Sequence, residues 1–76
     1  MKCPCVHIAI KGTVQGVGFR PFVFRTAHRF GITGWVRNDA SGVLIEAVGA
    51  NADLSEFIKA LQSAPPPLAR IQSCDV

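Results

Sequence analysis

The sequence lacks the features that mark membrane, secreted and metal-binding proteins. None of its apolar runs approaches the ~18 residues that cross a bilayer, and the start, Met1-Lys2-Cys3-Pro4-Cys5, lacks the long apolar stretch of a signal peptide. Three cysteines are an odd number, which does not suggest a disulfide framework. We therefore expect a cytoplasmic protein with reduced thiols and no membrane partner.

The sequence also lacks the spacing of cysteines and histidines that is typical of metal sites. Cys3-Pro4-Cys5 has one residue between its cysteines, whereas metal and redox loops of the Cys-x-x-Cys type have two. His7 alone does not complete a zinc set. The sequence therefore predicts no metal site and no cofactor.

Acidic residues are few, and the five of them face eight basic ones, for a net charge of +3. Basic side chains gather between Arg20 and Arg29 instead of forming a long track. A compact basic field suits a small anion better than nucleic acid, so no nucleic-acid partner is expected. For Arg25 and Arg29 the solvated face of a helix is the alternative interpretation.

Hydrophobic periodicity predicts alternating strands and helices within one small domain, residues 1–76. Strands are expected at 6–11, 32–38, 43–48 and 70–76, and helices at 21–30 and around 54–61, the second capped by Asn51 or Asp53. This β-α-β-β-α-β order is the α+β, ferredoxin-like split β-α-β sandwich, with two helices packed on one face of an antiparallel sheet. Its last strand should run antiparallel beside the first, bringing Cys5 and Cys74 close enough to cross-link on oxidation.

The most informative segment is the glycine-rich run from Gly12 to Pro21. Gly16 and Gly18 allow positive φ and leave backbone N–H groups uncovered, and a helix is expected to follow at once. Helix-end amides and a nearby guanidinium favour an oxyanion, so we expect a phosphate cradle made by Gln15, Gly16, Val17, Gly18, Phe19 and Arg20. A plain strand-to-helix turn remains the alternative.

Two separated segments resemble the signature of the acylphosphatase family. They are Gly12-x-Val14-Gln15-Gly16-Val17-x-Phe19-Arg20 and Gly34-x-Val36-x-Asn38, with Gly42-Val43 after the second. Phe19-Arg20-Pro21-Phe22-Val23 and Pro66-Pro67-Leu68-Ala69-Arg70-Ile71 are similar to the amino-terminal acylphosphatase-like domains of the HypF family, the carbamoyltransferases of nickel–iron hydrogenase maturation. The resemblance covers nearly the whole chain.

The resemblance implies an acylphosphatase whose substrate is carbamoyl phosphate, with Arg20 and Asn38 as catalytic residues. It also implies downstream domains in a longer multidomain protein and other hydrogenase maturation proteins as partners. A fifth, edge strand is usual in the family, and this sequence offers no segment for it after 70–76. Taken alone, Asn38 before Asp39 is more typical of a turn asparagine, and the match of the glycine loop to the same family favours the catalytic interpretation.

Three other functional classes share this fold or these sequence requirements. A non-catalytic module that binds and channels carbamoyl phosphate has the same sequence requirements and stays open. RNA-binding modules of this fold present stacking aromatics on two central strands, and the strand at 43–48 has none. Copper-chaperone-like domains need Cys-x-x-Cys where this chain has Gln15-Gly16-Val17-Gly18.

Overall fold

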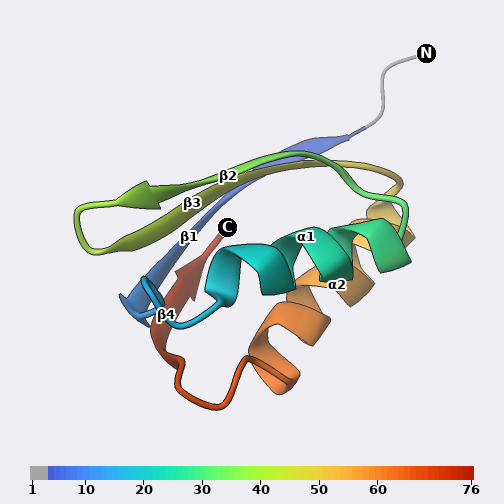
Figure 1. Ribbon diagram of the computed structural model, residues 1–76. Helices are drawn as coiled ribbons and strands as arrows, with labels where there is room; N and C mark the ends of the chain where they lie inside the picture. Colours follow the sequence, from blue (N-terminus) through green and yellow to red (C-terminus); the bar gives the residue numbers. More distant parts are fainter. Residues whose placement is uncertain (1–3) are drawn as a thin grey trace.

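The elements follow one another in the order that the sequence predicts (Figure 1). The computed structural model describes residues 4–76, so Cys3 lies outside the described residues. The elements are β1 (Cys5–Thr13), α1 (Phe19–Arg29), β2 (Thr33–Asp39), β3 (Gly42–Val48), α2 (Asn51–Ser63) and β4 (Arg70–Asp75). Among the described residues, no helix is long and apolar enough to span a membrane.

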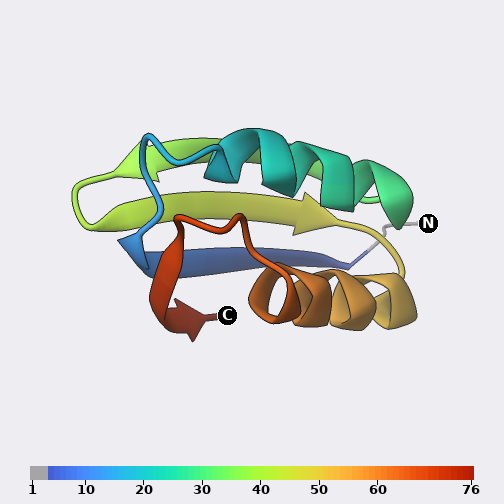
Figure 2. The same ribbon diagram turned by 60° about the horizontal axis from the view of Figure 1, so that its bottom comes forward.

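The four strands form one sheet in the order β2-β3-β1-β4, and every neighbouring pair is antiparallel. The predicted position of β4 beside β1 and the central position of β3 are therefore confirmed. Both helices cover the same face of this sheet and leave the other face open (Figures 1 and 2). This is the predicted ferredoxin-like arrangement.

The core lies between the sheet and the two helices. Alternation along β1 turns Ile8 and Ile10 toward the helices, and the antiparallel partners of these residues on β3, Ile45 and Val43, are buried with them. From α2, Phe57 closes the cluster with no exposed surface. The buried layer thus holds β1, β3 and the helices as one body. The loops at the ends of the sheet lie outside this layer.

The helix boundaries correct two sequence predictions. α1 begins at Phe19, two residues before the expected start at Pro21, because the Phe19 side chain is buried in the core. α2 begins after Ala50 without any side-chain cap, so neither Asn51 nor Asp53 is the N-cap. Burial of the apolar stripe, including Leu54, holds the start of this helix in place.

The predicted proximity of Cys5 and Cys74 is wrong. Cys74 pairs with Ile10, which is five residues beyond Cys5 along β1, a separation of about 17 Å at ~3.4 Å per residue. The two cysteines also face opposite sides of the sheet, since Cys74 shares the helix-covered face with Ile10 and Cys5 lies on the open face. A disulfide between them would require the strand to unpair.

Core burial predicts different tolerance to the same substitution at two phenylalanines. Phe57 has 0% of its surface exposed, so Phe57→Leu should lower the free energy of unfolding by about 1–2 kcal/mol through loss of contacts and a small cavity. Phe24 is 58% exposed, and Phe24→Leu should change the same quantity by less than about 0.5 kcal/mol. Urea denaturation of the two variants measures both values, and equal losses would contradict this packing.

Candidate phosphate-binding site

The glycine loop is held at both ends and open in the middle. Val14 and Phe19 are each 1% exposed and anchor the loop to the core. Between them Gln15, Gly16 and Gly18 are exposed at the end of the molecule where β1 leads into α1 (Figure 2). The loop backbone is therefore fixed in position while remaining accessible to a ligand.

Two glycines shape the loop through their backbone angles. Gly16 and Gly18 have φ of 72° and 78°, in the left-handed region, although nothing lies within 4 Å of a Cβ at either position. Glycine is thus needed for conformation, not for lack of space. The loop turns so that Gly18 becomes the N-cap of α1.

A group of backbone donors is left without partners by this turn. The first amide that enters the hydrogen bonds of α1 is that of Phe22, which donates to the Gly18 carbonyl at 3.2 Å. Within the described part of the chain, the N–H groups of residues 15–20 donate to no acceptor. Unpaired N–H groups at a helix start form an anion site, supported by the positive end of the helix dipole.

Arg20 adds a permanent positive charge to these donors. It is the second residue of α1, and its side chain is exposed. In residues 4–76 the one ion pair joins His7 and Glu46, so no carboxylate neutralises Arg20. No acidic residue lies in the first turn of α1. The guanidinium is therefore available for an anion at the loop.

Gln15 has a role that the sequence did not indicate. Its side-chain Nε2 donates to the carbonyl of Asp39 and, at 2.9 Å, to the carbonyl of Gly42. Asp39 and Gly42 form the last residue pair before the turn of the β2–β3 hairpin. The Gln15 side chain thus ties the glycine loop to the hairpin. Only the backbone N–H of Gln15 is left for the predicted binding of phosphate.

The same hairpin carries Asn38. This residue lies in β2 opposite Val43, whose side chain is buried beneath the helices, so Asn38 is on the sheet face that carries α1. A further tie holds the hairpin, since the Gly12 N–H donates to the Ser41 carbonyl at 3.3 Å. Asn38 and the glycine loop are therefore brought to the same end of the molecule.

The geometry argues against Asn38 as a turn residue. The turn is formed by the two residues after β2, and Asn38 precedes it within the strand. Its side chain is exposed, and among the described residues its carboxamide makes no hydrogen bond. An asparagine that shaped the turn would bond to the local backbone. The carboxamide is instead free to orient a bound molecule.

The site is an open cradle and not a deep pocket. Hollows of about 300 Å³ and 390 Å³ lie between α1 and β2 and on the open sheet face, and none of the predicted site residues lines either of them. His28 lines the first hollow, away from the loop. A cradle of backbone amides fits a phosphoryl group and leaves the rest of a substrate in solvent.

Comparison with known proteins agrees with this geometry. The acylphosphatase family model matches residues 6–76. The chain belongs to the acylphosphatase family. It is 42% identical to an acylphosphatase of Oceanobacillus iheyensis over 93% of this chain and 79% of that protein.

The carbamoyltransferases of the HypF family contain a similar domain. The chain is 54% identical to carbamoyltransferase HypF2 of Cupriavidus necator over 87% of its own length, but spans 8% of that protein. It superposes on full-length HypF in a phosphate- and nucleotide-bound form with a TM-score of 0.90 and 42% identity, covering 93% of this chain and 9% of that one. The predicted resemblance to acylphosphatase-like domains of HypF proteins is confirmed.

The tie between loop and hairpin predicts an ordered effect of two substitutions at Gln15. Gln15→Ala removes two hydrogen bonds and should lower the free energy of unfolding by about 1 kcal/mol. Gln15→Glu keeps the shape but sets a carboxylate against the carbonyls of Asp39 and Gly42, so it should destabilise more than alanine does. Thermal and urea denaturation compare the two, and a glutamate variant as stable as the parent would contradict the tie.

Proposed function

We propose that this domain hydrolyses acyl phosphates at the glycine loop. The observation that carries the proposal is the set of amides of residues 15–20, which have no acceptor among the described residues, with Arg20 as the second residue of α1 and Asn38 at the same end of the fold. The family relationship supports an acylphosphatase activity. The substrate's phosphoryl oxygens would accept hydrogen bonds from the loop amides and from Arg20.

The reaction requires no general acid. Water attacks phosphorus, the bond from phosphorus to the acyl oxygen breaks, and the acyl group leaves as a carboxylate or carbamate. Carboxylic acids have pKa values near 4, so the departing oxygen is stable without a proton. The proton of the attacking water passes to solvent or stays on the phosphate product. Neither a metal nor a cofactor is needed for these steps.

Catalysis then consists of charge stabilisation and positioning. The loop amides and Arg20 hold the phosphoryl oxygens as negative charge redistributes during transfer. The Asn38 carboxamide orients the attacking water in line with phosphorus. Gln15 is a positioning residue, because it holds the hairpin that carries Asn38 against the loop that binds phosphate.

Kinetics of two variants should separate these roles. Arg20 contacts oxygens in the ground state and the transition state, so Arg20→Ala should weaken substrate binding, weaken phosphate inhibition and lower kcat together. Asn38→Ala should lower kcat by about 10²–10³ and leave KM nearly unchanged. Arg20→Lys should not restore activity, since an ammonium cannot donate in a two-pronged geometry. Near-normal turnover by folded Asn38→Ala would refute the role in water positioning.

Within the same proposal the natural substrate is carbamoyl phosphate. The support is the similarity to proteins named carbamoyltransferases. In this context the domain would act in the cytoplasm as one part, residues 1–76, of a longer chain, with downstream domains and other hydrogenase maturation proteins as partners. The second candidate is a non-catalytic module that captures carbamoyl phosphate and passes it intact to a neighbouring domain, which the small share of each carbamoyltransferase covered by this domain favours.

Steady-state phosphate release distinguishes the two candidates. The domain is supplied with carbamoyl phosphate and, separately, with an aromatic acyl phosphate, and Asn38→Ala serves as the matched control. We expect multiple turnovers with both substrates, because the cradle contacts the phosphoryl group and leaves the acyl group in solvent. Saturable binding with no turnover above the Asn38→Ala background would favour the capture module.

A further inference from the structure

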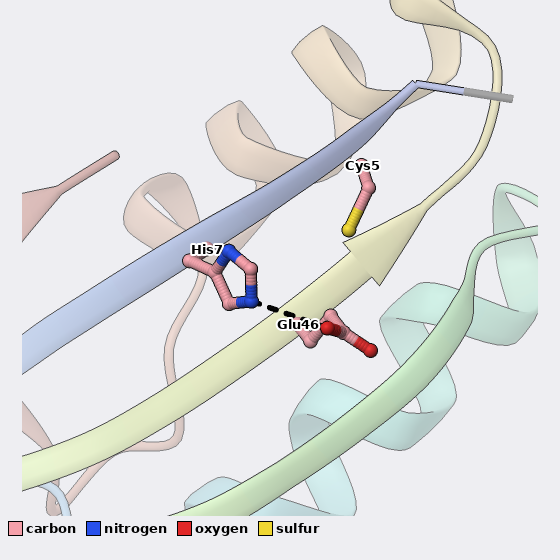
Figure 3. Close-up of side chains that lie close together, drawn as sticks. All are labelled: Cys5, His7 and Glu46. Carbon is pink, nitrogen blue, oxygen red and sulfur yellow. Dashed lines mark hydrogen bonds and ion pairs between the residues drawn. The ribbon is translucent and has the colours of Figure 1, made fainter.

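We propose that Cys5, His7 and Glu46 bind a divalent metal ion of the zinc type on the open face of the sheet. Figure 3 shows Cys5 and His7 from β1 and Glu46 from the adjacent β3 on the side of the sheet away from the helices. The ligand atoms of the three side chains all lie within 4.8 Å of one another. This site does not depend on the proposed hydrolysis.

Strand geometry brings the three residues together. Cys5 and His7 are two apart on β1, so both point to the open face. His7 pairs directly with Glu46 in the register of β1 and β3. Two residues of β1, at positions i and i+2, and their neighbour on β3 therefore form a triangle of sulfur, nitrogen and oxygen donors. This triangle lies on a rigid part of the fold.

The donor set selects the class of metal. A thiolate, an imidazole and a carboxylate are the three ligand types that zinc takes in proteins, and sites with three protein ligands keep a fourth position open. Hard ions such as Mg²⁺ and Ca²⁺ prefer oxygen ligands only. Binding would release the thiol proton of Cys5 to solvent and use the neutral imidazole of His7.

His7 and Glu46 would need to move little to bind one metal ion. Nε2 of His7 lies 3.1 Å from Oε1 of Glu46. Two such ligands on one tetrahedral zinc lie roughly 3.3–3.5 Å apart, from the usual bond lengths. A metal would therefore take the place of the hydrogen bond between His7 and Glu46, and rotation of the Cys5 side chain would bring its sulfur to the third position.

The surroundings leave room for the fourth ligand and supply a reporter. Beside His7, a hollow of about 390 Å³ opens to solvent and has space for a water molecule. The ring of Trp35, the only tryptophan, lies 6.5 Å from the His7 ring between centroids. A paramagnetic ion at the cluster should therefore quench tryptophan emission.

The cluster is separate from the phosphate site. It lies on the opposite face of the sheet from Asn38 and near the start of β1, whereas the glycine loop follows Thr13 at the other end of this strand. Six residues from His7 to Thr13 span about 20 Å. Metal binding and phosphate binding can therefore be measured independently.

Titration with Co²⁺, a spectroscopic substitute for Zn²⁺, tests the site in reduced protein. We expect quenching of Trp35 emission and a thiolate-to-cobalt charge-transfer band, both reversed by Zn²⁺. Cys5→Ser should abolish the band, and His7→Gln and Glu46→Gln should each weaken binding at least tenfold. Cys74→Ser and His28→Gln remove the same chemical groups outside the cluster and should bind like the parent. Circular dichroism confirms that each variant is folded.

Alkylation followed by mass spectrometry gives a second readout that does not depend on absorbance. Zn²⁺ should slow the modification of Cys5 and leave Cys74 unaffected. Burial, with the nearby Asp75 charge, raises the pKa of the Cys74 thiol against the lowering effect of a hydrogen bond with Gln62, so Cys74 serves as a slow internal control.

Three results would overturn the proposal. The first is the absence of a charge-transfer band at millimolar Co²⁺. The second is a band that survives both His7→Gln and Glu46→Gln unchanged, which would indicate binding by thiols alone. The third is a band lost in Cys3→Ser and kept in Cys5→Ser, which would remove Cys5 from the ligand set.

Discussion

The register in which β1 pairs with β3 is the constraint on which the other features of this domain depend. Opposite Ile8 lies Ile45, and opposite Ile10 lies Val43, so the apolar side chains of both strands meet on the face that the helices cover. A shift of one residue would turn these side chains to solvent. The same register sets Glu46 opposite His7 on the other face. One pairing thus determines both the core and the polar cluster behind it.

The proposed phosphate site depends on a second, weaker connection, between the glycine loop and the β2–β3 hairpin. A glycine loop can present free amides by itself, but the catalytic asparagine that we propose comes from a hairpin that follows α1 in the chain. Gln15 joins the two through the carbonyls of Asp39 and Gly42, and the Gly12 N–H adds a bond to Ser41. The loop and hairpin therefore form one unit, and a displacement of either would change the geometry between phosphate and water.

The two faces of the sheet are used differently. Helices bury one face, and the loop at the end of that face carries the proposed phosphate site. The open face keeps polar and aromatic side chains at the solvent, among them His7, Glu46 and Trp35, with the Arg37 guanidinium 5.0 Å above the Trp35 ring. A face with so many donors in reach of one another can hold a ligand without disturbing the core.

The sequence by itself determined the local features of this protein. Strict alternation in β1, the glycines of the loop and the apolar stripe of α2 follow from backbone and hydrophobic preferences of neighbouring residues, so element order and fold class could be predicted. The residues of the phosphate cradle stay a prediction. What it could not determine were contacts between distant segments. With Phe19 buried, α1 starts two residues earlier than predicted. The register of β4 against β1 places Cys74 opposite Ile10, away from Cys5. Only the tertiary structure placed Gln15 on the hairpin and Glu46 beside His7, because these contacts join residues 24 to 39 positions apart and depend on how strands pair, which no local pattern specifies.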